Sequence, residues 1–225
     1  MRKFRGPVRA WGVAALAAVL LSGCAGLRPG TAAQVGDERI TTREVDEVAT
    51  QFCKALETQL RQQAETIPHS YFRGGIAGTL AMREVAEQVA ADHGVEPESE
   101  EYRRQLADLR RNVASLPEEQ QEAVITLESA PFYVQAAQTA VGEKLLDGEG
   151  EANEFTAAGA EEMERWIEEN DVEFDPALNT TLRDGQIAVA DEALSFPVSD
   201  AAKTAQEEQP NAALARQLPD PHRCG

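Results

Sequence analysis

Cysteine and histidine are the residue types in this chain best suited to chemistry, and each occurs three times. The cysteines are Cys24, Cys53 and Cys224, and the histidines are His69, His93 and His222. The histidines lack the spacing of metal-binding motifs such as HxxxH, and the cysteines do not form a CxxC pair. No nucleophile elbow, phosphate-binding loop or dinucleotide-binding loop occurs. The sequence therefore predicts no catalytic residue, metal site or cofactor, and we expect that the protein is not an enzyme.

The other polar residues that could do chemistry are expected to lie on solvent-exposed surfaces. Asp and Glu are numerous, but they fall on polar faces of predicted helices, where no single pair stands out as a catalytic dyad. His69 and His93 are expected at the surface or at helix ends. The acidic segment 147–151 lacks the ligand spacing of an EF-hand, so we expect a solvated turn and not a calcium site.

Cys24 follows a segment with the layout of a secretory leader. Four basic residues and no acidic residue precede an apolar run over 11–21. That run is about 11 residues long, whereas a membrane-spanning helix needs roughly 20, so it matches a signal-peptide core. Leu21-Ser-Gly-Cys24 resembles the bacterial lipobox, whose cysteine accepts a diacylglycerol. We predict a signal peptide over 1–23 and a lipidated Cys24 that holds the chain at the outer face of the cell membrane. The alternative is an ordinary signal peptide with a chance cysteine.

The other two cysteines would then lie in an oxidising compartment, where disulfides persist. The simplest arrangement is one disulfide between Cys53 and Cys224, closing a loop of roughly 170 residues that the chain-entropy model credits with up to about 5 kcal/mol. The alternative is two separate thiols, with Cys53 a small buried residue.

The charge balance excludes one class of partner. The chain has 21 basic and 39 acidic residues and a formal net charge of −18. The leader contributes four positive charges, so its removal leaves about −22. Nucleic acid is therefore not expected as a partner, because its phosphates require Lys and Arg, and lying flat on anionic lipid is disfavoured. Only 5% of the residues are aromatic, so one domain with an aliphatic core is expected.

The secondary structure is predicted to begin with a hairpin and to continue as helices. Gly36-Asp37 is a turn pair between two short strands, and Thr41 and Glu44 have the spacing of a helix capping box. Helices are predicted over 42–66, 70–93, 98–116, 118–129, 131–146 and 156–170. Pro131 is expected to break the fourth from the fifth, and Thr156 to cap the sixth.

Apolar positions indicate how these helices pack. Residues 45–60 place an apolar stripe with Cys53 on one face of the first helix. Residues 75–78 include two glycines that favour a close helix contact. The apolar positions of 102–116 form a seam for another helix, with a client or partner surface as the alternative. Short β-prone segments follow at 172–174, 187–190 and 194–198, and one of them can pair with the hairpin.

Several segments together resemble a known family. VGDERITTREVDE at 35–47, the helix–turn–helix stretch that begins LAMREVAEQVAADHGV at 80–95, and RWIEENDVEFDP at 165–176 are similar to the N-terminal domain of SurA-type chaperones. The likeness covers about 33–198 and is nearest to the form that actinobacterial lipoproteins carry alone. Full members also contain parvulin-type prolyl isomerase domains, and no such segment occurs here, so the resemblance implies a holding function without isomerase activity.

We therefore predict a mainly α fold: an elongated multi-helix domain over 33–199, with an N-terminal β-hairpin, after a tether at 24–32 and before an irregular tail at 200–225. The expected function is that of a membrane-anchored, extracytoplasmic chaperone-like lipoprotein that binds unfolded or exported polypeptides. The alternatives are a scaffold lipoprotein with one specific envelope partner and a degenerate prolyl isomerase.

Overall fold

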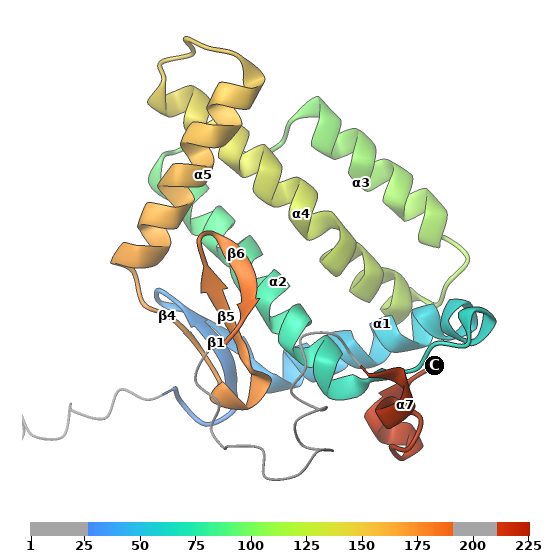
Figure 1. The fold of residues 1–225 in the computed structure, drawn as a ribbon. Helices are drawn as coiled ribbons and strands as arrows, with labels where there is room; N and C mark the ends of the chain where they lie inside the picture. Colours follow the sequence, from blue (N-terminus) through green and yellow to red (C-terminus); the bar gives the residue numbers. More distant parts are fainter. Residues whose placement is uncertain (1–26, 191–210) are drawn as a thin grey trace, which may run out of the picture.

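The computed structural model describes residues 27–190 and 211–225, and it is mainly α-helical, as predicted (Figure 1). The helices are α1 (Thr42–Gln63), α2 (His69–Asp92), α3 (Glu100–Val113), α4 (Glu118–Leu145), α5 (Ala152–Glu169) and α7 (Ala212–Ala215). The strands are β1 (Thr31–Val35), β2 (Glu38–Thr41), β3 (Ile67–Pro68), β4 (Val172–Phe174), β5 (Thr180–Arg183), β6 (Gln186–Val189) and β7 (Arg223–Cys224). Short 3-10 turns cover Pro176–Leu178 and Asp220–His222.

The predicted hairpin and its pairing with a later strand are both confirmed. β1 pairs antiparallel with β2 on one side and with β4 on the other. Ala33 lies opposite Ile40 in one pair and opposite Phe174 in the other, which brings residues of both ends of the domain together. Ala33 and Val35 are fully buried, so this small sheet closes one side of the helical core. β1 begins inside the segment predicted as a tether, and the predicted strand 194–198 lies outside the described residues.

α1 follows the hairpin directly, and Thr41 caps it with one of the two hydrogen bonds of the predicted capping box. The Thr41 hydroxyl accepts a hydrogen bond from the Glu44 backbone N–H at 3.1 Å, which satisfies a free donor at the start of the helix. The stripe of the first helix is buried at Val45, Ala49, Phe52 and Leu60. α1 ends three residues earlier than predicted, because Ala64 adopts a left-handed conformation and the chain then enters β3.

α4 corrects the predicted break at Pro131. The helix runs through this proline, which is exposed, from Glu118 to Leu145. A proline costs one backbone hydrogen bond inside a helix, but Leu127, Ala130 and Ala137 on both sides of it are buried, and α4 packs along α2 and α5. Tertiary packing therefore keeps the helix continuous. Leu145, the last residue of the helix, is 42% exposed.

α4 and α5 cross with their backbones in close approach. A Cβ atom built at Gly142 would overlap the Phe155 carbonyl, and one at Gly159 would overlap the Gln138 carbonyl. α5 begins at Ala152 and not at the predicted Thr156, because Glu151 and Glu154 form the capping box. Thr156 lies inside the helix and its hydroxyl is 2.8 Å from that of Thr139 on α4.

α3 and the C-terminal segment lie at the margins of the helical core. The seam of α3 packs on α4, with Tyr102 and Val113 buried, as expected for a helix seam. Tyr102 also meets Tyr133 edge to face. Within the predicted tail, residues 211–225 contain α7, a 3-10 turn and β7, and β7 pairs with β3.

Candidate functional site

The two cysteines predicted to pair lie together. A disulfide joins Cys53 on α1 to Cys224 in β7, with their Cα atoms 5.6 Å apart. Cys224 is 1% exposed, and the Arg216 guanidinium donates to the Ala64 carbonyl at 2.7 Å beside it. The C-terminal segment is thus fastened to the end of α1. Cys24 lies outside the described residues.

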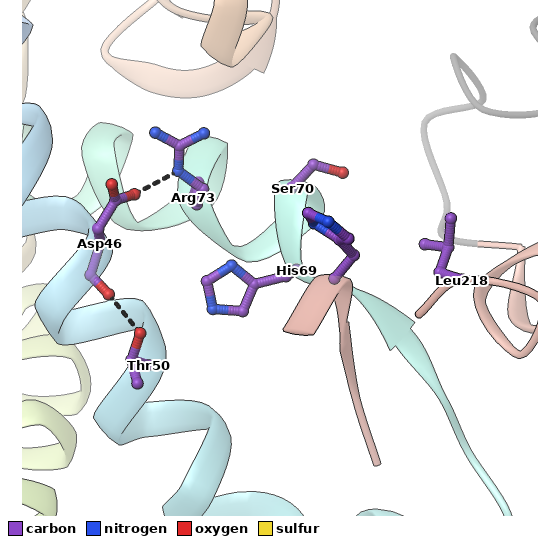
Figure 2. Close-up of a pocket in the computed structure, with 7 residues that line it drawn as sticks. Asp46, Thr50, His69, Ser70, Arg73 and Leu218 are labelled. Atoms are coloured by element: carbon purple, nitrogen blue, oxygen red, sulfur yellow. Dashed lines mark hydrogen bonds and ion pairs between the residues drawn. The ribbon is translucent and has the colours of Figure 1, made fainter. Parts of the chain in front are cut away.

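A polar cleft of about 560 Å³ opens where α1, the start of α2 and the C-terminal segment meet (Figure 2). It is lined by Asp46, Thr50, His69, Ser70, Arg73, Leu218 and His222. Sequence reasoning missed this meeting of two histidines, because they lie at opposite ends of the domain and share no motif. Only the pairing of β7 with β3 brings His222 to His69.

The charges of this cleft are mostly satisfied within the protein. Arg73 Nε donates to Asp46 Oδ1 at 2.5 Å, and the Thr50 hydroxyl donates to the Asp46 backbone carbonyl. Burial lowers the pKa of His69, and the nearby Arg73 charge lowers it further. His69 is therefore neutral at pH 7, but the carboxylate that would orient it as a base is paired with Arg73. Among the residues that line the cleft, Asp46 supplies the carboxylate, and Arg73 is its ion-pair partner.

His93 has a structural role at the other end of α2. Its Nε2 lies 2.8 Å from Glu162 Oε1 on α5, and Arg165 forms an ion pair with the same carboxylate. Burial acts to raise the pKa of Glu162, but the hydrogen bonds from His93 and Arg165 outweigh it and hold that pKa below its ordinary value. Trp166 Nε1 donates to Asp92 in the same region. This cluster fixes α5 against the end of α2.

Two kinds of feature are absent from the part of the chain that the structure describes. No group of three or more His, Cys, Asp or Glu residues there is arranged to hold a metal ion. None of the helices in residues 27–190 and 211–225 is long and apolar enough to cross a membrane.

The exposed apolar side chains form the feature that best fits a binding site. Tyr71 on α2 is 48% exposed, and Ile187 and Val189 on β6 are 43% and 38% exposed. Within the described residues β6 pairs only with β5, so its outer edge is open. We call Ile187, Val189 and the edge of β6 the β6 patch.

Glycines on α2 explain how the β5–β6 hairpin reaches this position. A Cβ at Gly74 would lie 2.6 Å from Thr180 Oγ1, and one at Gly78 would lie 2.6 Å from Ile187 Cγ2. The predicted close contact of this segment is therefore made with a hairpin and not with a helix. Gly75 has no neighbour within 4 Å of its Cβ position and lies one turn after Tyr71 on the same face.

Comparison with known proteins adds no relative. No family model matches the chain, and no curated protein or solved structure is significantly similar to it. The resemblance to SurA-type domains therefore stays a prediction from the residues.

Proposed function

We propose that the protein is a membrane-anchored, extracytoplasmic lipoprotein that holds unfolded or exported polypeptides without catalysing a reaction on them. The leader and the lipobox-like Leu21–Cys24 support the anchor at Cys24. The Cys53–Cys224 disulfide supports an oxidising compartment, because such bonds are rare in the cytosol.

The β6 patch carries the binding part of this proposal. An open edge strand presents unpaired N–H and C=O groups, and proteins normally protect such an edge with charges or proline. β6 instead has Ile187 and Val189, two residues apart and on one face. An extended polypeptide can add to this edge by backbone hydrogen bonds while its apolar side chains cover Ile187 and Val189.

The charge of the protein suits a holding function. A client gains by hiding apolar side chains from water, while the net charge of −18 keeps the holder soluble and separate from other copies. Because the Asp46–Arg73 pair leaves no free acid in the polar cleft, the proposal assigns no bond-making step to any residue.

The test is suppression of aggregation by purified residues 25–225. We expect reduced light scattering from a chemically unfolded model protein and no acceleration of prolyl isomerisation in a proline-peptide assay. Unchanged scattering at excess holder contradicts the proposal. Rapid isomerisation would favour the degenerate isomerase, and crosslinking to one dominant envelope protein would favour the scaffold.

A pair of matched variants locates the site. Ile187→Ser with Val189→Ser removes apolar surface from the β6 patch, and Leu145→Ser with Leu146→Ser removes a similar amount from the end of α4, where these leucines are 42% and 37% exposed. Covering each side chain is worth roughly 1 kcal/mol, so the first variant should bind client about 20-fold more weakly. Equal losses in both variants would remove the β6 patch from the proposal.

A further inference from the structure

α3 lies at the margin of the described part of the molecule. It packs chiefly on α4, so much of its surface faces solvent. Figure 1 shows α3 and the start of β1 at opposite ends of the body. If the chain is anchored just before β1, α3 lies on the side remote from the membrane.

Four arginines share the outer face of α3. The side chains of Arg103, Arg104, Arg110 and Arg111 all belong to exposed residues. Their positions follow an i, i+1, i+7, i+8 pattern, which places two rows of charge on one face, with about 10.5 Å between successive arginines in each row. Ala107 and Ala114 are exposed between the rows, and their small side chains keep the middle of the face flat.

These arginines are only partly used inside the protein. Arg111 forms an ion pair with Asp108, and Arg103 donates to the Glu98 carbonyl at 2.8 Å. Arg104 and Arg110 make no hydrogen bond or ion pair with any residue in 27–190 or 211–225. α3 also carries Glu100, Glu101 and Asp108, so the helix has a net charge of only about +1, but the guanidinium groups of Arg104 and Arg110 are free in a chain whose net charge is −18.

We propose that the outer face of α3 binds an acidic helix of a partner protein. The flat strip at Ala107 and Ala114 lets a second helix approach closely, since small residues reduce the distance between helix axes. Carboxylates seven residues apart on that helix match the spacing of Arg104 and Arg111 and of Arg103 and Arg110. Arginine suits such pairs because its planar guanidinium holds a carboxylate with two parallel hydrogen bonds.

This surface is separate from the β6 patch, so the inference does not depend on client binding. The alternatives are outcomes of the same test. A lipid surface is disfavoured by the distance of α3 from the start of β1 in Figure 1. A phosphate polymer could pair with the arginines, but it has no flat helical face to pack against Ala107 and Ala114.

The probe is a synthetic helical peptide of three heptads with Glu flanking an Ala strip, compared with the same peptide carrying Gln. Binding to residues 25–225 is measured by fluorescence anisotropy at low and at physiological salt. We expect the Glu peptide to bind at least tenfold more tightly than the Gln peptide, and to weaken as salt rises. Absence of binding to the Glu peptide at low salt overturns the proposal.

Arg104→Glu with Arg110→Glu should abolish this binding. Arg39→Glu with Arg43→Glu is the matched control. Both residues are exposed and lie in β2 and at the start of α1, away from α3, and the two substitutions change the net charge of the protein by the same amount. The control should bind normally. Equal losses of peptide binding in the two variants would mean that only the net charge of the protein matters. Tighter binding of polyphosphate than of the Glu peptide would assign the face to a phosphate polymer. Either result overturns the proposal.

Discussion

Glycines lie at two contacts of this protein, and the contacts differ in what surrounds the missing side chain. At the α4–α5 crossing, Gly142 and Gly159 each face backbone atoms of the other helix. On α2, Gly74 also meets a backbone carbonyl, that of Leu178, but Gly78 faces the side chain of Ile187 and Gly75 faces open space. The first contact is closed and rigid, whereas the second leaves bare helix beside exposed apolar residues. The α4–α5 glycines therefore allow two helices to pack at their backbones, whereas Gly75 makes no such contact.

The largest effect is expected from a variant that disrupts the contact between α4 and α5. Gly142→Ala with Gly159→Ala should lower the free energy of unfolding by about 4 kcal/mol, because each methyl group meets a backbone carbonyl that no rotamer change can move. Urea unfolding followed by circular dichroism measures it. An unchanged midpoint would show that the two helices do not touch along their backbones.

The Cys53–Cys224 disulfide is a second closed contact, and it holds the C-terminal segment on α1. Cys53→Ser with Cys224→Ser should cost about 3 kcal/mol, since the disulfide closes most of the described chain into one loop. The wild-type protein should lose the same amount in reductant, and the variant should be insensitive to it. A wild type that unfolds identically with and without reductant would contradict this role.

The cluster of His93, Glu162 and Arg165 supports the end of α5 near the closed contact, and its effect depends on pH. Because the pKa of Glu162 is lower folded than its ordinary value of 4.5, its contribution is present above about pH 4.5 and disappears as the pH falls through the folded pKa. Glu162→Gln should cost about 1 kcal/mol at pH 7 and progressively less below pH 4.5. Urea midpoints across pH 3 to 7 test this, and a pH-independent difference would contradict it.

The smallest expected effect has the opposite sign. Gly75→Ala should stabilise the protein by about 0.5 to 1 kcal/mol, because alanine favours a helix and nothing lies near the added methyl group. Thermal unfolding measures the gain. Gly78→Ala is the companion variant, in which the same gain is offset by contact with Ile187, and stabilisation equal to that of Gly75→Ala would show that the hairpin does not rest on α2.

Local signals predicted much of the fold. The Gly36-Asp37 turn, the Thr41 cap and the apolar period of 45–60 each depend on neighbours in the chain, and all three are found in the structure. The break at Pro131 was wrong, because the cost of one missing hydrogen bond is local whereas the packing that offsets it comes from α2 and α5. The predicted cap of α5 at Thr156 was also wrong, since Glu151, the last residue of the predicted turn, forms a capping box with Glu154.

The candidate sites were less predictable. The β6 patch depends on the hairpin resting on α2, where Ile187 meets Gly78, and the cleft brings His69 together with His222. No spacing rule links such positions. The arginines of α3 are visible in the sequence, but only the packing of α3 on α4 shows that their face is turned to solvent.

The sequence by itself determined the helical class, the hairpin and the pattern of each buried face, because periodicity and caps act within a few residues. It also carries the leader and the acidic charge from which anchoring and partner class are inferred. The tertiary structure decided the continuity of α4, the backbone contact of α4 with α5 and the surfaces left open. These features depend on which distant segments pack together, and the free energy of that packing cannot be assigned to any single stretch of the chain.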